Sequence, residues 1–185
     1  MNIKKKFFAM LVILCYSQFT LGGIITGPAL TNTNTGWANN GLSFTALQDS
    51  TLTSFVYNNQ GLADTILLVD ELGSILQSVN LVGGDTQQLI NVSWSLLAGE
   101  IYGLLATQEF GDNGKWVDAF FPVSNADISV NGFADNGLGS VAGTDYWFNF
   151  NEITTTTNAV PEPSTLAIFT LGIIGLASRR FKKQS

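Results

Sequence analysis

The segment Leu89-Ile-Asn-Val-Ser-Trp-Ser-Leu96 shows the clearest alternation of apolar and polar residues in the chain. From position 90 to position 96, every even position is apolar and every odd position is asparagine or serine. Successive side chains of an extended strand point to opposite faces, so one face of this segment is expected to be buried and the other exposed. The pattern predicts a half-buried β-strand with Trp94 in the core.

Similar segments recur along the middle of the chain. Clusters of Gly, Asn and Asp, such as Asn39-Asn40-Gly41 and Gly83-Gly84-Asp85, separate short apolar-rich runs, and none of these runs keeps a helical period. Short strands with such turns, spaced by about 8–12 residues, are typical of sandwiches. We therefore predict an all-β domain, an antiparallel β-sandwich or jelly roll over residues 23–153, followed by a threonine-rich linker over residues 154–159. The other expected strands are 42–47, 51–57, 65–69, 75–82, 101–107, 116–121 and 146–153.

Two turn patterns add to this prediction. Asp70-Glu-Leu-Gly73 followed by Ile75 has the form of a hairpin turn, and Leu97-Ala-Gly-Glu-Ile-Tyr102 has the form of an entry into a strand. Together they resemble the sandwich modules of secreted bacterial proteins, which supports the fold and indicates no ligand.

Charge is divided sharply along the 185 residues. Seven of the eight cations lie in the first six or the last seven residues, whereas residues 23–160 hold Lys115 against thirteen acids, a net charge of −12. A body this acidic repels phosphate backbones, so we expect no nucleic-acid partner. The chain has no histidine, which excludes imidazole metal ligands and Ser-His or Cys-His nucleophile systems.

The N-terminal segment has the pattern of a secretory signal. Lys4-Lys5-Lys6 precedes the apolar run from Phe7 to Phe19, and small residues follow up to Gly23. This order predicts a signal peptide over residues 1–22, recognised by the Sec translocon and removed by signal peptidase. An uncleaved membrane anchor and lipidation at Cys15 stay open as alternatives, although Leu14 stands where lipidation needs a small residue.

The C-terminal segment combines a proline-containing motif, an apolar run and a basic cluster. Pro161, Glu162 and Pro163 precede the apolar residues 165–177, and the cluster consists of Arg179, Arg180, Lys182 and Lys183. Proline suits the first turn of a helix, and the cations resist transfer across a bilayer. The fifteen residues 164–178 span about 22 Å as a helix, less than the roughly 30 Å hydrocarbon core. A short, temporary inner-membrane anchor is therefore expected, with an ordinary tail anchor as the alternative.

These features, in this order, resemble the PEP-CTERM sorting signal of Gram-negative bacteria that make exopolysaccharide, here over residues 160–185. The resemblance implies that Pro161, Glu162 and Pro163 are recognised by an exosortase, a polytopic membrane protease similar to a transpeptidase. It also implies release to the cell surface or to an extracellular matrix. The same segment is catalogued as the C-terminal domain of ice-binding proteins, which we interpret as an address and not as an activity.

The body offers little chemistry of its own. Its acids occur mostly beside Gly or Asn in turns, and nothing places two of them together as a glycosidase requires, so we expect no enzyme. Oxygen ligands without histidine suit calcium, and the candidates are Asp112, Asn113 and Asp118, with a second cluster from Asn125 and Asp127 through Asp135 and Asn136. Trp37, Trp116 and Trp147 lie near expected strand ends, where they are candidates for stacking on sugar rings; the alternative is that they fill the interior.

The sequence as a whole indicates a secreted, non-enzymatic surface or matrix protein with a structural or adhesive role, sorted by an exosortase-like partner and in contact with exopolysaccharide. An extracellular carbohydrate-binding module and a tail-anchored periplasmic enzyme are the alternatives.

Overall fold

The computed structural model describes residues 22–35, 39–58, 61, 63–107, 112–135 and 146–158. These residues form thirteen strands and no helix, and every strand pair is antiparallel. The all-β prediction is confirmed. The strands are β1 (Gly23–Thr26), β2 (Asn32–Thr35), β3 (Asn40–Ala46), β4 (Ser50–Asn58), β5 (Asp64–Asp70), β6 (Ile75–Leu81), β7 (Gln87–Leu96), β8 (Ile101–Ala106), β9 (Asp112–Asp118), β10 (Val123–Ser124), β11 (Ile128–Asp135), β12 (Tyr146–Phe148) and β13 (Phe150–Thr157).

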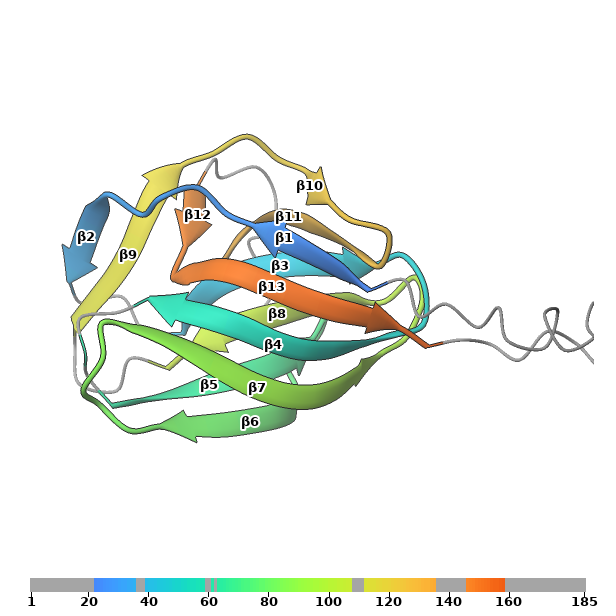
Figure 1. The fold of residues 1–185 in the computed structure, drawn as a ribbon, viewed down its shortest axis with the longest axis horizontal. Coiled ribbons are helices and arrows are strands. Elements are labelled where there is room, and N and C mark those ends of the chain that lie inside the picture. The colour runs from blue at the N-terminus through green and yellow to red at the C-terminus, as the bar shows by residue number, and fades with distance from the viewer. Residues whose placement is uncertain are drawn as a thin grey trace, which may run out of the picture.

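The strands build two facing layers. A four-stranded sheet in the order β1-β13-β4-β7 lies over a six-stranded sheet in the order β10-β11-β3-β8-β5-β6, as Figure 1 shows. A three-stranded sheet, β12-β9-β2, adjoins β11 and β3 through β12. Side chains from the facing surfaces of the two larger sheets form one apolar cluster, which makes the domain a β-sandwich.

The core is rich in aromatic rings that join the strands of the four-stranded sheet. Trp94 is buried on β7, as its alternating pattern predicts, whereas Leu89 on the opposite face is 63 % exposed. The ring of Phe55 lies 5.8 Å from that of Trp94 and meets Phe150 edge to face at 5.5 Å. Such packing has to supply the stability, because the described strands contain one lysine and no arginine with which acids can pair.

The expected threonine-rich linker is wrong for residues 154–157. These residues form the second half of β13, which lies between β1 and β4, and Thr155 is fully buried. Threonine is β-branched and favours strands, and its hydroxyl can be buried when it is hydrogen-bonded. The first described strand, β1, pairs with the last, β13, and we call the segment that they enclose, residues 22–158, the folding unit.

Two other expected strands have different bounds. The strand expected at 116–121 is β9, which begins earlier and ends at Asp118. The strand expected at 146–153 is divided at Asn149, whose φ of 58° lies in the left-handed region, into β12 and β13. The left-handed residue turns the chain from the three-stranded sheet into the four-stranded one.

The turn between β5 and β6 is the hairpin that its sequence predicts. Oδ1 of Asp70 accepts hydrogen bonds from the N–H groups of Leu72 at 2.9 Å and Ser74 at 2.8 Å. Gly73 has a φ of 79°, a conformation that side chains with a Cβ rarely adopt. The hydrogen bond from the Ser74 backbone is the main reason why the pKa of Asp70 lies below its ordinary value of 3.8.

The lowered pKa of Asp70 makes the stability of the folded domain depend on pH. A carboxyl group whose pKa is lower in the folded state contributes stability above its unfolded pKa, and this contribution is lost as pH falls through the folded pKa. An Asp70→Asn variant of residues 22–158 should therefore melt below the wild type at neutral pH, and the difference should shrink as the pH falls below 3.8 and through the lower pKa of the folded state. Thermal melts across this range measure the difference. An equal difference at every pH would contradict the assignment.

A hydrogen bond to a tyrosine hydroxyl stabilises the turn that leads into β8. The hydroxyl of Tyr102 accepts a hydrogen bond of 2.9 Å from the backbone N–H of Leu97, and its ring stacks on Phe44 at 5.6 Å in the core. Gly99, with a φ of 85°, makes the turn between the two bonded residues. A tyrosine bonded to backbone a few residues upstream is a recurrent corner of β-sandwiches.

Removing this hydroxyl should have a modest, measurable effect. Tyr102→Phe keeps the ring but leaves the Leu97 N–H without its partner, so we expect the free energy of unfolding of residues 22–158 to fall by about 1 kcal/mol. Denaturant titration measures this loss. Tyr146→Phe is the control, because no hydrogen bond from the Tyr146 hydroxyl is found among the described residues, and it should change stability by less than about 0.5 kcal/mol.

Candidate functional site

The two ends of the folding unit lie side by side. Gly23 at the start of β1 pairs with Thr155 near the end of β13. Beyond β13 the chain is held for one more residue, because the N–H of Asn158 donates to the Asp49 carbonyl at 3.0 Å and Thr51 Oγ1 donates to Asn158 Oδ1 at 2.9 Å. We call this region, with Gly23, Thr155 and Asn158, the export end of the domain. Two residues separate Asn158 from Pro161.

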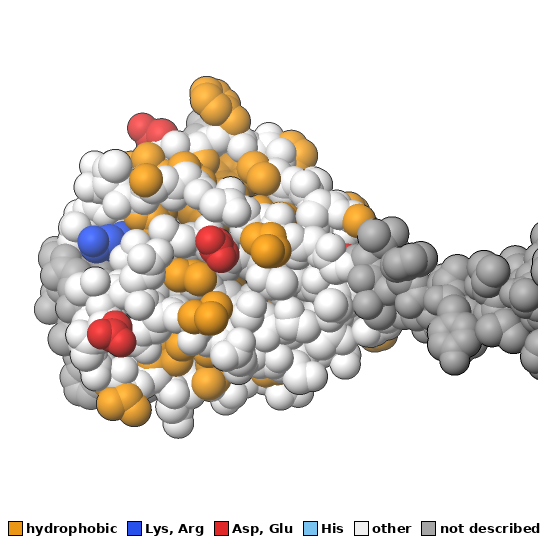
Figure 2. All heavy atoms as spheres, viewed as in Figure 1, with side chains coloured by type: hydrophobic (Ala, Val, Ile, Leu, Met, Phe, Trp, Pro, Cys, Tyr) orange, Lys and Arg blue, Asp and Glu red, His pale blue; other side chains and the backbone are white. Residues whose placement is uncertain are grey.

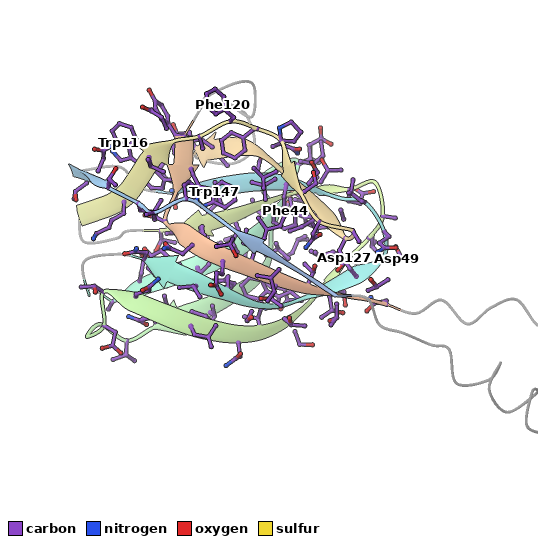
Figure 3. The ribbon with its side chains drawn as sticks, turned by 45° about the horizontal axis from the view of Figure 1, so that its top comes forward. Phe44, Asp49, Trp116, Phe120, Asp127 and Trp147 are labelled. Atoms are coloured by element: carbon purple, nitrogen blue, oxygen red, sulfur yellow. The ribbon has the colours of Figure 1, made fainter. Side chains whose placement is uncertain are left out.

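A buried carboxylate fixes the export end. Asp127 is fully buried between β10 and β11. Its Oδ1 accepts hydrogen bonds from Gln48 Nε2 and Thr157 Oγ1, both at 2.6 Å, and its Oδ2 accepts one from Thr155 Oγ1 at 2.6 Å. Figure 3 shows Asp127 close to Asp49 where β13 ends. These donors take the place of water around the buried carboxylate. Asp127 thereby connects the end of β13 to the six-stranded sheet.

This use of Asp127 differs from the calcium cluster that the sequence indicated. Oδ1 of Asn125 accepts the backbone N–H groups of Asp127 and Ile128, both at 2.8 Å. The oxygens of this cluster are thus engaged by donors of the protein itself. Sequence reasoning missed the arrangement because Gln48, Thr155 and Thr157 are far from Asp127 along the chain.

The first calcium candidate is wrong as a single site. Asp112 and Asp118 stand at the two ends of β9, which places their backbones about 20 Å apart, whereas calcium needs its ligands within about 2.6 Å. The side chains of Asp112 and Asn113 lie outside the described residues, and Asp118 is exposed. Where the structure describes side chains, no group of three or more Asp, Glu, His or Cys residues is close enough to hold a metal ion.

The three tryptophans proposed to stack on sugars have different environments. Trp147 is fully buried, donates its Nε1–H to the Phe150 carbonyl and stacks on Phe121 at 5.7 Å, so its proposed role is wrong. Trp116 is half-buried and meets Tyr146 edge to face at 5.0 Å. Figure 3 shows Trp147 among the strands and Trp116 nearer the outside. Trp37 lies outside the described residues.

The outer face of the four-stranded sheet carries mainly hydroxyl and amide groups. Register places Thr156, Thr51 and Ser95 in one row across the sheet, and Thr154, Ser54 and Asn91 in another. We call these six residues the hydroxyl face. Glu152 is an acidic residue of β13 that precedes Thr154 by two positions. Figure 2 views this side, where the white spheres of uncharged polar side chains and backbone predominate and hydrophobic side chains are scattered among them.

The expected export signals lie outside the described residues. This applies to residues 1–21 of the signal peptide, to Pro161, Glu162 and Pro163, and to the cluster Arg179, Arg180, Lys182 and Lys183. The part of the chain with a described structure contains no helix of the length and hydrophobicity that a membrane crossing requires.

Comparison with known proteins identifies one segment. A comparison with curated proteins finds no match to the chain. Residues 159–183 match the family described as the PEP-CTERM protein-sorting motif. This motif implies an exported protein that is sorted at the membrane by an exosortase. The chain thus carries, directly after the last residue held by the export end, a PEP-CTERM protein-sorting motif.

Proposed function

We propose that this chain is a non-enzymatic β-sandwich protein that an exosortase releases to the cell surface or the extracellular matrix, where it acts as a structural or adhesive component. The N-terminal segment is the signal peptide that takes it into the Sec pathway, and the hydrophobic segment after Pro163 holds it in the inner membrane until it is processed.

The observation that supports this proposal most directly is the position of the sorting motif relative to the folded domain. The motif begins at residue 159, and Asn158 is still hydrogen-bonded to Asp49 and Thr51. Cleavage in the motif would therefore leave every strand intact. Among the candidate stacking rings, Trp147 is fully buried, and the carboxylate of Asp127 accepts three side-chain hydrogen bonds from within the domain.

Intact mass of the mature protein from the native host tests the proposal. The wild-type protein should lack the first 22 residues and the cluster from Arg179 to Lys183. A variant with Pro161, Glu162 and Pro163 all replaced by alanine should keep the basic cluster and stay in the membrane fraction. Phe120→Ala, at a side chain that is 94 % exposed on the domain, is the matched control and should be processed normally. A wild-type protein that keeps its basic cluster would show permanent anchoring instead.

Binding of a neutral polysaccharide is a second candidate function, supported by the hydroxyl face. Hydroxyl and amide groups on a flat sheet can exchange hydrogen bonds with sugar hydroxyls, and the acidity of the domain repels anionic polymers. Retention of residues 22–158 on neutral polysaccharide, with little dependence on salt, is the expected result. Replacement of Thr51 and Thr156 by valine should weaken it, whereas Trp116→Ala tests the half-buried ring separately. No retention on any neutral polymer would exclude this candidate.

A further inference from the structure

The edge strands at the two borders of the sandwich differ in length and in the residues that lie near them. At one border the edges are β1 and β10, which are four and two residues long, and Pro28 and Pro122 stand close to them. Short strands and nearby prolines are the usual means by which proteins prevent edge strands from pairing with another chain. This border is therefore protected.

The opposite border lacks this protection. Its edges are β6 and β7, seven and ten residues long, which Figure 1 shows together along one side of the domain. Neither strand contains proline or a charged residue. In the described structure β6 pairs with β5 alone, so the backbone groups on its other side have no strand partner. Long, uncharged edges of this kind are templates for strand addition.

The side chains at β6 favour β6 over β7 as the pairing edge. Residues 75–78 and residue 80 are exposed, and large apolar side chains flank both ends of the strand. Leu72 is 90 % exposed and Ile75 is 63 % exposed at its beginning, and Val82 is 87 % exposed just after its end. Pairing along β6 would thus cover apolar surface as well as satisfy backbone groups.

Charge argues that the occupant is a second copy of the same chain. Residues 74–84 carry no charge, in a body that holds thirteen acids and one lysine. An equally acidic copy can approach closely along this neutral stretch, whereas it is repelled elsewhere. A strand that pairs with itself must do so antiparallel about a two-fold axis, which is the commonest symmetry of dimers.

We propose that two copies of this protein join through their β6 strands, which pair antiparallel and extend the two six-stranded sheets into one continuous sheet. The proposal concerns the folded domain and holds whether or not the sorting proposal is correct. It has one electrostatic consequence. Antiparallel pairing centred on Ser78 brings Glu71, before β6 in one copy, toward Asp85, after β6 in the other. Added salt should therefore strengthen the dimer by screening the repulsion between these two carboxylates.

Cysteine cross-linking of the full chain in cells tests the pairing directly. Residues opposite each other in an antiparallel pair have Cα atoms about 4.5–5.5 Å apart, which lies within the range of a disulfide. In a Cys15→Ser background, Leu76→Cys, Ser78→Cys and Asn80→Cys are made singly and oxidised. At least one should give a band of twice the mass on a non-reducing gel. Thr26→Cys, on the protected edge β1, is the control and should give none.

A second experiment introduces charges of the same or of opposite sign at Ser78 in the two copies. Two differently tagged full chains should co-purify as wild type, more strongly at higher salt. Ser78→Lys in both copies, or Ser78→Glu in both, should reduce co-purification about tenfold, and one copy of each should restore it, which also shows that both variants fold. Cross-linking at Thr26 as strong as at β6, no cross-link at any β6 position, or failure of the mixed pair to recover would overturn the proposal.

Discussion

A chain that ends at Ile153 should fail to fold, whereas one that ends at Asn158 should unfold cooperatively. The four threonines removed pair with β4, and two of them also pair with β1. Their loss leaves a row of ladder hydrogen bonds unmade, each with a net contribution of about 1 kcal/mol, and exposes the buried carboxylate of Asp127 without Thr155 and Thr157. A loss of about 5 kcal/mol is comparable with the whole stability of many domains.

Circular dichroism melts and amide NMR spectra of residues 22–153 and 22–158 make this comparison. The matched control carries Gly-Ser-Gly-Ser after Asn158 of the longer chain, which extends that chain without touching β13, and it should melt like residues 22–158. If residues 154–157 were a linker, as their composition first indicated, the two truncated chains would melt alike.

Asp127→Ala should be the most damaging single substitution at the export end. It removes the acceptor of a buried hydrogen bond from Thr155 Oγ1 and of two part-buried hydrogen bonds from Gln48 Nε2 and Thr157 Oγ1. Buried polar groups that lose a partner cost about 1–3 kcal/mol each, so we expect a loss of about 3 kcal/mol or more in the free energy of unfolding. Denaturant titration of residues 22–158 measures it.

Two variants control this prediction. Asp118→Ala removes an exposed carboxylate and should change stability by less than about 0.5 kcal/mol. Asp127→Asn keeps one acceptor oxygen and the side-chain shape, so its loss should lie between those of the other two variants. A stability of Asp127→Ala equal to that of Asp118→Ala would mean that the three hydrogen bonds contribute nothing to the fold.

Strands with regular apolar patterns could be predicted from the sequence, and those without them could not. The alternation in β7 is a local signal because one face of that strand packs on the core, and the apolar runs of β5 and β8 are local signals because most of their residues are buried. β2 is Asn-Thr-Asn-Thr and has no apolar residue at all. β11 loses its alternation at the irregularity between Val130 and Gly132, where the pairing register with β3 shifts.

The candidate site also has one part that could be predicted from the sequence and one part that could not. The sorting motif is contiguous, so its order of proline motif, apolar run and basic cluster is visible without a structure. The support of the export end is not contiguous. Asp127 meets Gln48 across 79 residues and Thr155 across 28, and only the sheet order brings them together. For the same reason the half-buried position of Trp116 and the fully buried position of Trp147, one on each of two neighbouring strands, follow from packing and not from any property of tryptophan.

The pairing of β1 with β13 determines how the domain responds to mechanical load. Force applied between the two ends of the folding unit acts where Gly23 pairs with Thr155, so the pairs between β1 and β13 open one after another, as in a zipper, and yield at low force. Force applied between Asn158 and the far side of the molecule acts along β13, where the bonds to β1 and β4 resist sliding together. A domain held through Asn158 is thus pulled in its stronger direction, and β1 bears no tension as long as nothing pulls on its N-terminal side.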